Sequence, residues 1–271
     1  MSPTDQQRLL RLSWGFAAAT ILSNITWVLT HGSTRDALTI AGVALFFSAS
    51  LTHSLARYGV RWSVVFFAIA CTFGWSVEAV GTLTGFPFGE YLYADRLGPS
   101  LGSVPLVIPL AWAMMSYPCF VMAQASVRST VSRVVLGAAL LASWDLFLDP
   151  QMVSEGHWRW ADSRQHVPGI PDIPVTNFLG WIFAALLLMT LLIFCDRIPR
   201  ESSTLAQVSL RQPLLLLTWV YLSSVLANAV FFDRPSVALI GGFMMGIPMA
   251  FVWLLENQSR PSRENAPAHY G

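Results

Sequence analysis

The chain has 271 residues, of which 54% are hydrophobic and only 11% are charged. A soluble domain usually carries about 25% charged residues, so this composition excludes an ordinary soluble protein. The net charge is +1 and no basic cluster is present, so nothing indicates a nucleic-acid partner.

Stretches close to the ~20 apolar residues needed to cross a hydrocarbon core follow one another along the chain. Lipid cannot satisfy backbone polar groups, so such stretches must be helices. The pattern predicts an all-α, polytopic transmembrane bundle of about eight helices, with seven possible, in a single domain over residues 1–271. The predicted helices cover residues 12–31, 36–56, 62–82, 104–126, 131–149, 177–195, 212–232 and 236–256.

Two connections in this pattern are long, 83–103 and 150–176, and residues 257–271 are predicted to form a flexible C-terminal tail. The first apolar stretch could be mistaken for a signal peptide. It covers about twenty residues and leads into further spans, so we interpret it as a retained helix.

Arginine placement predicts the orientation, because cytoplasmic loops carry an excess of Lys and Arg. With the N-terminus in the cytoplasm, the arginines on the cytoplasmic side are Arg8, Arg11, Arg57, Arg61, Arg128, Arg133, Arg197, Arg200, Arg211, Arg260 and Arg263. Those on the opposite side are Arg35, Arg96, Arg159, Arg164 and Arg234. We therefore expect a multi-pass cell-membrane protein with both termini cytoplasmic and both long loops on the other side.

Intramembrane acids are the first candidates for function, since a charged group deep in a bilayer is costly. Glu78 lies in the last turns of the third predicted helix, and Asp145 and Asp149 lie four residues apart on one face of the fifth. Asn177 and Asn228 fall at the same predicted depth. Each polar residue has a structural alternative, namely an interhelical hydrogen bond, a helix end near water or, for Asn177, a helix N-cap.

The two long loops are rich in aromatic residues. Residues 85–93 combine glycine and proline with Phe86 and Phe88, which excludes a regular helix, and the second loop contains Trp158 and Trp160. These side chains suit either a substrate site or an interfacial aromatic belt. The fourth predicted helix is interrupted by prolines, which favours a bent helix beside a cavity: Pro105, Pro109 and Pro118.

No metal or cofactor motif is evident. His157 and His166 do not pair at metal-ligand spacing, and the single cysteines read as small apolar residues. There is no Gly-rich phosphate loop, nucleophile elbow or His-rich box. We therefore expect no metal site and a reaction without a cofactor.

Long motifs rich in Trp, Pro and Gly lie between residues 70 and 185. They are Gly85-Phe-Pro-Phe-Gly-Glu-Tyr-Leu-Tyr93, Leu97-Gly-Pro99, Val104-Pro-Leu-Val-Ile-Pro-Leu-Ala-Trp112, Tyr117, Ser143-Trp-Asp-Leu-Phe-Leu-Asp-Pro-Gln-Met152, Gly156-His-Trp-Arg-Trp160, Gly169-Ile-Pro171 and Asn177-Phe-Leu-Gly-Trp181. In these motifs the chain resembles the integral membrane carotenoid hydratases of the CruF type, which include γ-carotene and bisanhydrobacterioruberin hydratases. It departs from them at Asp172-Ile-Pro-Val-Thr176, where a shorter aromatic loop is expected.

The resemblance implies a hydro-lyase of carotenoid biosynthesis that adds water to the terminal isopropylidene double bond of an acyclic carotenoid. The reactants would be a carotenoid held in the bilayer and water, with other carotenoid-biosynthesis enzymes as candidate partners. Protonating an alkene needs a neutral carboxyl group, which burial and a nearby like charge both favour. Asp145 or Asp149 is the preferred general acid and Glu78 the alternative. The remaining carboxylate, with Asn177, could hold the attacking water.

A tertiary carbocation would need aromatic faces for stabilisation. The candidate residues for this and for substrate binding are Trp144, Phe147, Phe88, Tyr91, Tyr93, Trp158 and Trp160, with the amides of Asn177 and Asn228.

Other functions remain open at this point. Asp145 and Asp149 resemble half of the magnesium–diphosphate site of an intramembrane prenyltransferase, although a second Asp-rich motif and any Lys are lacking. A carotenoid cyclase would share the protonation step. A proton-coupled transporter or a carotenoid-binding membrane protein would need no catalysis, and intramembrane acids also serve as proton relays.

Overall fold

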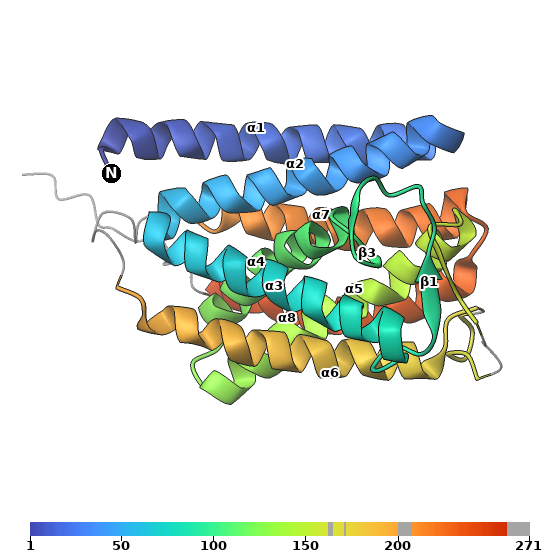
Figure 1. Ribbon diagram of the computed structural model, residues 1–271. Coiled ribbons are helices and arrows are strands. Elements are labelled where there is room, and N and C mark those ends of the chain that lie inside the picture. The colour runs from blue at the N-terminus through green and yellow to red at the C-terminus, as the bar shows by residue number, and fades with distance from the viewer. Residues whose placement is uncertain (162–164, 171, 200–207, 259–271) are drawn as a thin grey trace, which may run out of the picture.

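The computed structural model describes residues 1–161, 165–170, 172–199 and 208–258, and within them the fold is a bundle of eight α-helices (Figure 1). The helices are α1 (Pro3–Val28), α2 (Gly32–Tyr58), α3 (Val60–Thr84), α4 (Val107–Ser126), α5 (Thr130–Ser154), α6 (Val175–Leu192), α7 (Arg211–Leu226) and α8 (Pro235–Gln258). A 3₁₀ turn, η1 (Ile193–Arg197), extends α6, and a π-helical turn, η3 (Ala227–Phe231), extends α7. The predicted helical bundle is confirmed.

Seven of these helices, α2 to α8, are long and apolar enough to cross a membrane. Helix α1 is not among them, and it lies alongside α2 at the edge of the bundle (Figure 1). The chain is therefore a multi-pass membrane protein. The direction of insertion and the single-domain boundaries stay predictions. Some residues used in these predictions lie outside the described residues. They are Arg164, Arg200, Arg260 and Arg263 of the orientation argument, Pro171 of the family motifs, and residues 259–271 of the predicted tail.

Helix α4 is the centre of the bundle. In its apolar window 78% of the residues are buried, against 22% in α7, and α4 contacts α2, α3, α5, α7 and α8. A helix that is apolar on all sides belongs in such a central position. Its neighbours α3 and α5 carry the acids, Glu78 on α3 and Asp145 and Asp149 on α5, so α4 packs directly beside the helices that position them.

Short signals in the sequence set the helix ends. Gly59, with φ of 87°, is the only residue between α2 and α3, and a positive φ of this kind is readily accessible to glycine. Gly85, in the left-handed region, ends α3 and donates its N–H to the Gly81 carbonyl at 2.8 Å. The side chain of Ser129 caps α5 by accepting from the N–H of Ser132.

Several predicted boundaries were wrong, and three of them have a clear physical reason. Helix α1 begins at Pro3 rather than at residue 12, because a polar first turn with a Ser2 cap continues the apolar stretch. Helix α5 continues through Pro150 to Ser154, since a proline removes only one intrahelical hydrogen bond and this turn is packed on its buried side. Pro105 belongs to a strand and not to the fourth helix, which begins at Val107.

The two long connections are not irregular throughout. β1 (Tyr91–Tyr93) pairs antiparallel with β4 (Trp158–Trp160), and β2 (Ser100–Leu101) pairs with β3 (Val104–Pro105). The register places Tyr91 opposite Trp160 and Tyr93 opposite Trp158. The β1–β4 ribbon covers one end of the bundle, at the right in Figure 1. It thus joins two connections that lie far apart in the sequence.

Candidate active site

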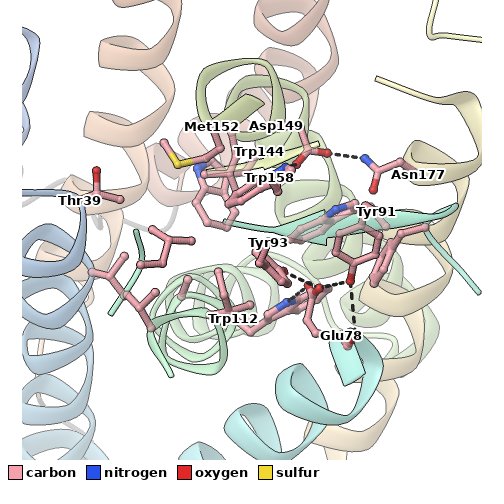
Figure 2. Close-up of a pocket in the computed structure, with 18 of the residues that line it drawn as sticks. Thr39, Glu78, Tyr91, Tyr93, Trp112, Trp144, Asp149, Met152, Trp158 and Asn177 are labelled. Carbon is pink, nitrogen blue, oxygen red and sulfur yellow. Dashed lines mark hydrogen bonds between the residues drawn. The ribbon is translucent and has the colours of Figure 1, made fainter. Parts of the chain in front are cut away.

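A cavity of about 100 Å³ lies under the β1–β4 ribbon, between α3, α4, α5 and α6 (Figure 2). Its charged or amide side chains are Glu78, Asp149 and Asn177. The aromatic side chains that line it are Phe88, Tyr91, Tyr93, Trp112, Trp144, Trp158, Trp160 and Trp181. An apolar pocket with a few convergent polar groups is the usual form of a small-molecule site.

The β1–β4 ribbon carries four of these aromatic residues for a simple geometric reason. Successive side chains of a strand point to opposite faces, so Tyr91, Tyr93, Trp158 and Trp160 share one face and line the cavity. Leu92, between the tyrosines, is 62% exposed on the other face. The aromatic residues of the long loops therefore form the roof of the cavity.

Glu78 on α3 forms one wall. Its Oε2 accepts from the hydroxyl of Tyr93 at 2.7 Å and from the hydroxyl of Tyr91, and its Oε1 accepts from the Trp112 indole at 3.0 Å. Burial, together with the adjacent Glu78, raises the pKa of both tyrosines well above the usual value, so both remain protonated donors at neutral pH. A carboxylate offers about four acceptor positions, so one position on Oε1 stays available.

Asp149 on α5 forms the facing wall. Its Oδ1 accepts from the Trp158 indole at 3.2 Å, and its Oδ2 accepts from the amide nitrogen of Asn177. The same amide nitrogen donates to Oδ2 of Asp145 at 3.1 Å. Asn177 therefore bridges the two aspartates, one turn apart on α5, from the first turn of α6. In Figure 2 Asp149 and Asn177 lie on the side of the cavity away from Glu78.

Asp145 lies behind Asp149 and not on the cavity surface. It is 1% exposed and is absent from the cavity lining, and its Oδ1 has no hydrogen-bond partner among the described residues. Buried polar atoms are almost always hydrogen-bonded.

Trp181 and Trp112 form an aromatic floor that the sequence analysis did not assign to the site. Their rings stack at 4.3 Å with an interplanar angle of 6°, and Trp144 meets Trp181 edge-on at 6.2 Å. Both tryptophans belong to the family motifs quoted above, and this was the sequence signal that could have assigned them to the site. Their convergence depends on how α4 and α6 pack.

Close backbone approach holds the roof against α6. A Cβ on Gly180 would lie 2.5 Å from the Pro87 carbonyl oxygen and 2.9 Å from the Phe88 ring. Only glycine permits this contact without displacement. Gly180 thus fixes Phe88, whose ring lines the cavity.

Ion pairs attach the roof to α2. Arg35 pairs with Glu155 at 2.6 Å, and Arg96 pairs with Asp36 at 2.8 Å. His157, fully buried, lies 3.7 Å from Asp36. These contacts connect the loops on both sides of the ribbon to the same helix end.

Apart from Asp145, the predicted site residues fall into two groups. Glu78, Asp149, Asn177, Phe88, Tyr91, Tyr93, Trp144, Trp158 and Trp160 all line the cavity. Asn228 does not line it, and its amide donates to the Ser224 carbonyl at 2.9 Å. Phe147 packs toward Gly241 of α8, where a Cβ would lie 2.7 Å from its ring. No cluster of three or more potential metal ligands occurs among the described residues.

Fold and cavity together describe a multi-pass membrane protein with an acid-lined, aromatic cavity at one end of its helix bundle. Residues 36–248 match the model of the family described as carotenoid biosynthesis protein, so the chain belongs to that family. The family resemblance inferred from the sequence motifs is thereby confirmed. The family match begins in α2 and leaves out α1.

A curated relative is also similar. Over 117 residues the chain is 29% identical to a bisanhydrobacterioruberin hydratase of Haloarcula japonica. The matched region covers 41% of this chain and 38% of that relative, so the chain spans about two fifths of the relative's length. No solved structure matches the chain.

Proposed function

We propose that this protein adds water across the terminal isopropylidene double bond of an acyclic carotenoid, giving a tertiary alcohol. The observation that carries the proposal is the pair of acidic walls, Glu78 and Asp149, facing each other across one aromatic cavity. The name of the Haloarcula japonica relative supports the same reaction class.

The first step is protonation of the alkene by the Asp145–Asp149 pair. Two carboxyl groups bridged by one amide are suited to holding a single proton between them, as in other paired-acid sites. Asp149 reaches the cavity, so it is the proton donor, and Asp145 is the positioning residue behind it. The proton adds to the less substituted alkene carbon. The electron pair of the double bond forms the new C–H bond, and the other alkene carbon becomes a tertiary carbocation.

Aromatic faces stabilise this cation. A ring face attracts a positive charge within about 6 Å, most strongly for tryptophan. Trp144, Trp158 and Trp181 line the same cavity as Asp149. Apolar walls also keep competing water away from the cation until the positioned water attacks.

Water addition completes the reaction from the Glu78 wall. The free acceptor position on Oε1 of Glu78 can hold a water molecule, and Tyr91, Tyr93 and Trp112 fix the carboxylate that holds it. The water oxygen bonds to the cationic carbon and one of its protons passes to Glu78. After the reaction Glu78 carries one more proton and the aspartate pair one fewer. Transfer of a proton from Glu78 to the aspartate pair through water closes the cycle. The net change is one water added.

The site needs neither a metal nor an organic cofactor for this sequence of steps, and we propose that none takes part. We further propose that the enzyme works in the cell membrane with both termini cytoplasmic, which requires the 26-residue α1 to cross the bilayer alongside α2 in addition to the seven apolar helices. A cavity at one end of the bundle lets an apolar chain enter from the bilayer while water enters from the surface. Other enzymes of carotenoid biosynthesis remain candidate partners.

The test is expression of the full chain in a host that makes an acyclic carotenoid, in medium enriched in ¹⁸O-labelled water. Mass analysis of the pigments should show one labelled water gained per reacted end. Unchanged pigments in a membrane that contains the protein would contradict the proposal. A cyclised carotenoid without added oxygen would indicate a cyclase, and release of diphosphate would indicate a prenyltransferase.

A further inference from the structure

A second, larger cavity lies next to the acid cavity. It has a volume of about 370 Å³ and lies between α1, α2, α5 and α7 with η3. Small-molecule sites usually occupy about 300–1,000 Å³. The acid cavity, at about 100 Å³, is large enough for the end of a carotenoid and not for its chain.

The two cavities share a wall. Six residues line both of them: Thr39, Val43, Met114, Trp144, Leu148 and Met152. Two are methionines, whose flexible side chains adapt to irregular ligands. A linear molecule that passes these side chains would have its end beside Asp149 and its remainder in the second cavity.

The second cavity makes few polar demands on a ligand. Thr20 donates to the Phe16 carbonyl at 2.8 Å, and Thr39 donates to the Arg35 carbonyl while accepting from the Trp27 indole. These hydroxyls are therefore satisfied within the protein. Asn24, Gln151, Ser223 and Ser224 also line the cavity, but most of its lining residues are apolar, which suits a largely hydrocarbon ligand.

The aromatic lining favours a conjugated hydrocarbon. Trp27 and Phe232 line the cavity and meet edge-to-face at 5.7 Å, and Trp219 lines it too. The indole nitrogen of Trp219 is buried without a hydrogen-bond partner among the described residues. An indole N–H can donate weakly to a π system, and a polyene supplies one along its whole length.

The cavity also reaches the outer surface of the bundle. Ile25 of α1, Leu226 of α7 and Phe231 of η3 line it and are 45%, 56% and 54% exposed. In a membrane this surface meets lipid, so an apolar molecule could enter sideways without crossing water.

We propose that the second cavity binds the conjugated polyene arm of the substrate while the end group occupies the acid cavity. This inference rests on the proposed function for the identity of the end group. Binding of the arm itself does not depend on turnover, so the two can fail separately.

Gly42 provides the test, because it lines the second cavity and not the first. A Cβ there would meet Oδ1 of Asn24 at 3.5 Å and Oγ of Ser23 at 3.7 Å, both ordinary contacts, so a larger side chain at Gly42 would take up space between α1 and α2 at the wall of this cavity. The adjacent Ala41 is exposed on the outside of α2 and gives the matched control.

The experiment measures binding of an acyclic C40 polyene to the purified full chain in phospholipid nanodiscs, by tryptophan quenching and by the shift of the polyene absorption. We expect Gly42→Leu to weaken binding at least tenfold and Ala41→Leu to leave it unchanged. Ser223→Leu, on the α7 side of the same cavity, should weaken binding as well and serves if Gly42→Leu does not fold.

Wild-type affinity in both cavity variants would overturn the inference and would mean that the cavity holds bilayer lipid only. Asp149→Asn separates the two proposals, since it should bind the polyene and not hydrate it. Polyene binding that depends on Gly42, in a wild-type protein that hydrates nothing, would sustain this inference and contradict the proposed function.

Discussion

Tyr93 and Trp158 face each other across the β1–β4 ladder, and each donates to a different acid. The Tyr93 hydroxyl donates to Glu78 at 2.7 Å and the Trp158 indole donates to Asp149 at 3.2 Å. Their rings contact each other edge-to-face at 5.7 Å. A two-stranded ribbon from two distant loops therefore holds both acidic walls in one geometry.

The aspartate pair should respond unequally to neutralisation. Asp149→Asn should lower hydration by about 10³-fold, within the range of a lost general acid, because Asp149 reaches the cavity. Asp145→Asn should cost about tenfold to a hundredfold, since Asp145 acts through Asn177 and Asp149. Pigment conversion rates at equal membrane protein levels measure both. An Asp145 variant more impaired than the Asp149 variant would contradict the assigned roles.

The hydroxyl of Tyr93 should matter through Glu78. Tyr93→Phe removes a hydrogen bond to a carboxylate, which typically contributes about 1.5–3 kcal/mol, so turnover should fall at least about tenfold. Tyr221→Phe is the matched control, because Tyr221 donates to the Gly242 carbonyl in another part of the bundle. Equal rates for Tyr93→Phe and the wild type would show that the Tyr93 hydrogen bond to Glu78 does not contribute to turnover.

Substitution of Trp158 tests whether this residue belongs to the site or only anchors the protein in the membrane interface. It is 8% exposed and bonded to Asp149, so Trp158→Phe should reduce hydration about tenfold. Trp253→Phe loses a comparable indole bond, to Thr218, away from the cavity and should keep its activity. A mild effect at Trp158 would favour the interfacial-belt interpretation.

Gly180 should tolerate no side chain. A Cβ would lie 2.5 Å from the Pro87 carbonyl oxygen, so Gly180→Ala must displace the roof or α6, at a cost of about 1–3 kcal/mol. Gly15→Ala meets nothing within 4 Å and should not be destabilised. Thermal unfolding in detergent measures both. Equal midpoints for Gly180→Ala and the wild type would show that the roof is not held by this contact.

Acid should loosen the roof through His157. Burial lowers its pKa, and Arg96 adds to this effect while Asp36 and Glu155 oppose it. The unfolded chain therefore binds a proton that the folded chain does not, so stability decreases as pH falls through about 6.5. The thermal midpoint of His157→Gln should decline less between pH 7.5 and pH 5.5 than that of the wild type. His166→Gln, at an exposed histidine, is the control. An identical decline in the thermal midpoint of the wild type and both variants would exclude His157 as the cause.

The sequence by itself determined the membrane bundle, its helices to within a few residues at most ends, the acids that lie at or behind the cavity, and the family. Hydropathy suffices for this, because lipid forces every spanning segment to satisfy its own backbone. The four-residue spacing of Asp145 and Asp149 likewise placed them on one helical face.

Only the tertiary structure decided which polar residues meet. It moved Asn228 out of the site, set Asp145 behind Asp149, brought in Trp112 and Trp181, and paired the two long loops. Such contacts join residues far apart in the sequence: Trp112 and Glu78 are 34 positions apart, and Phe88 and Trp160 are 72 apart. Local propensity and hydropathy carry no information about which distant segments pack together, so the cavity exists only in the folded chain.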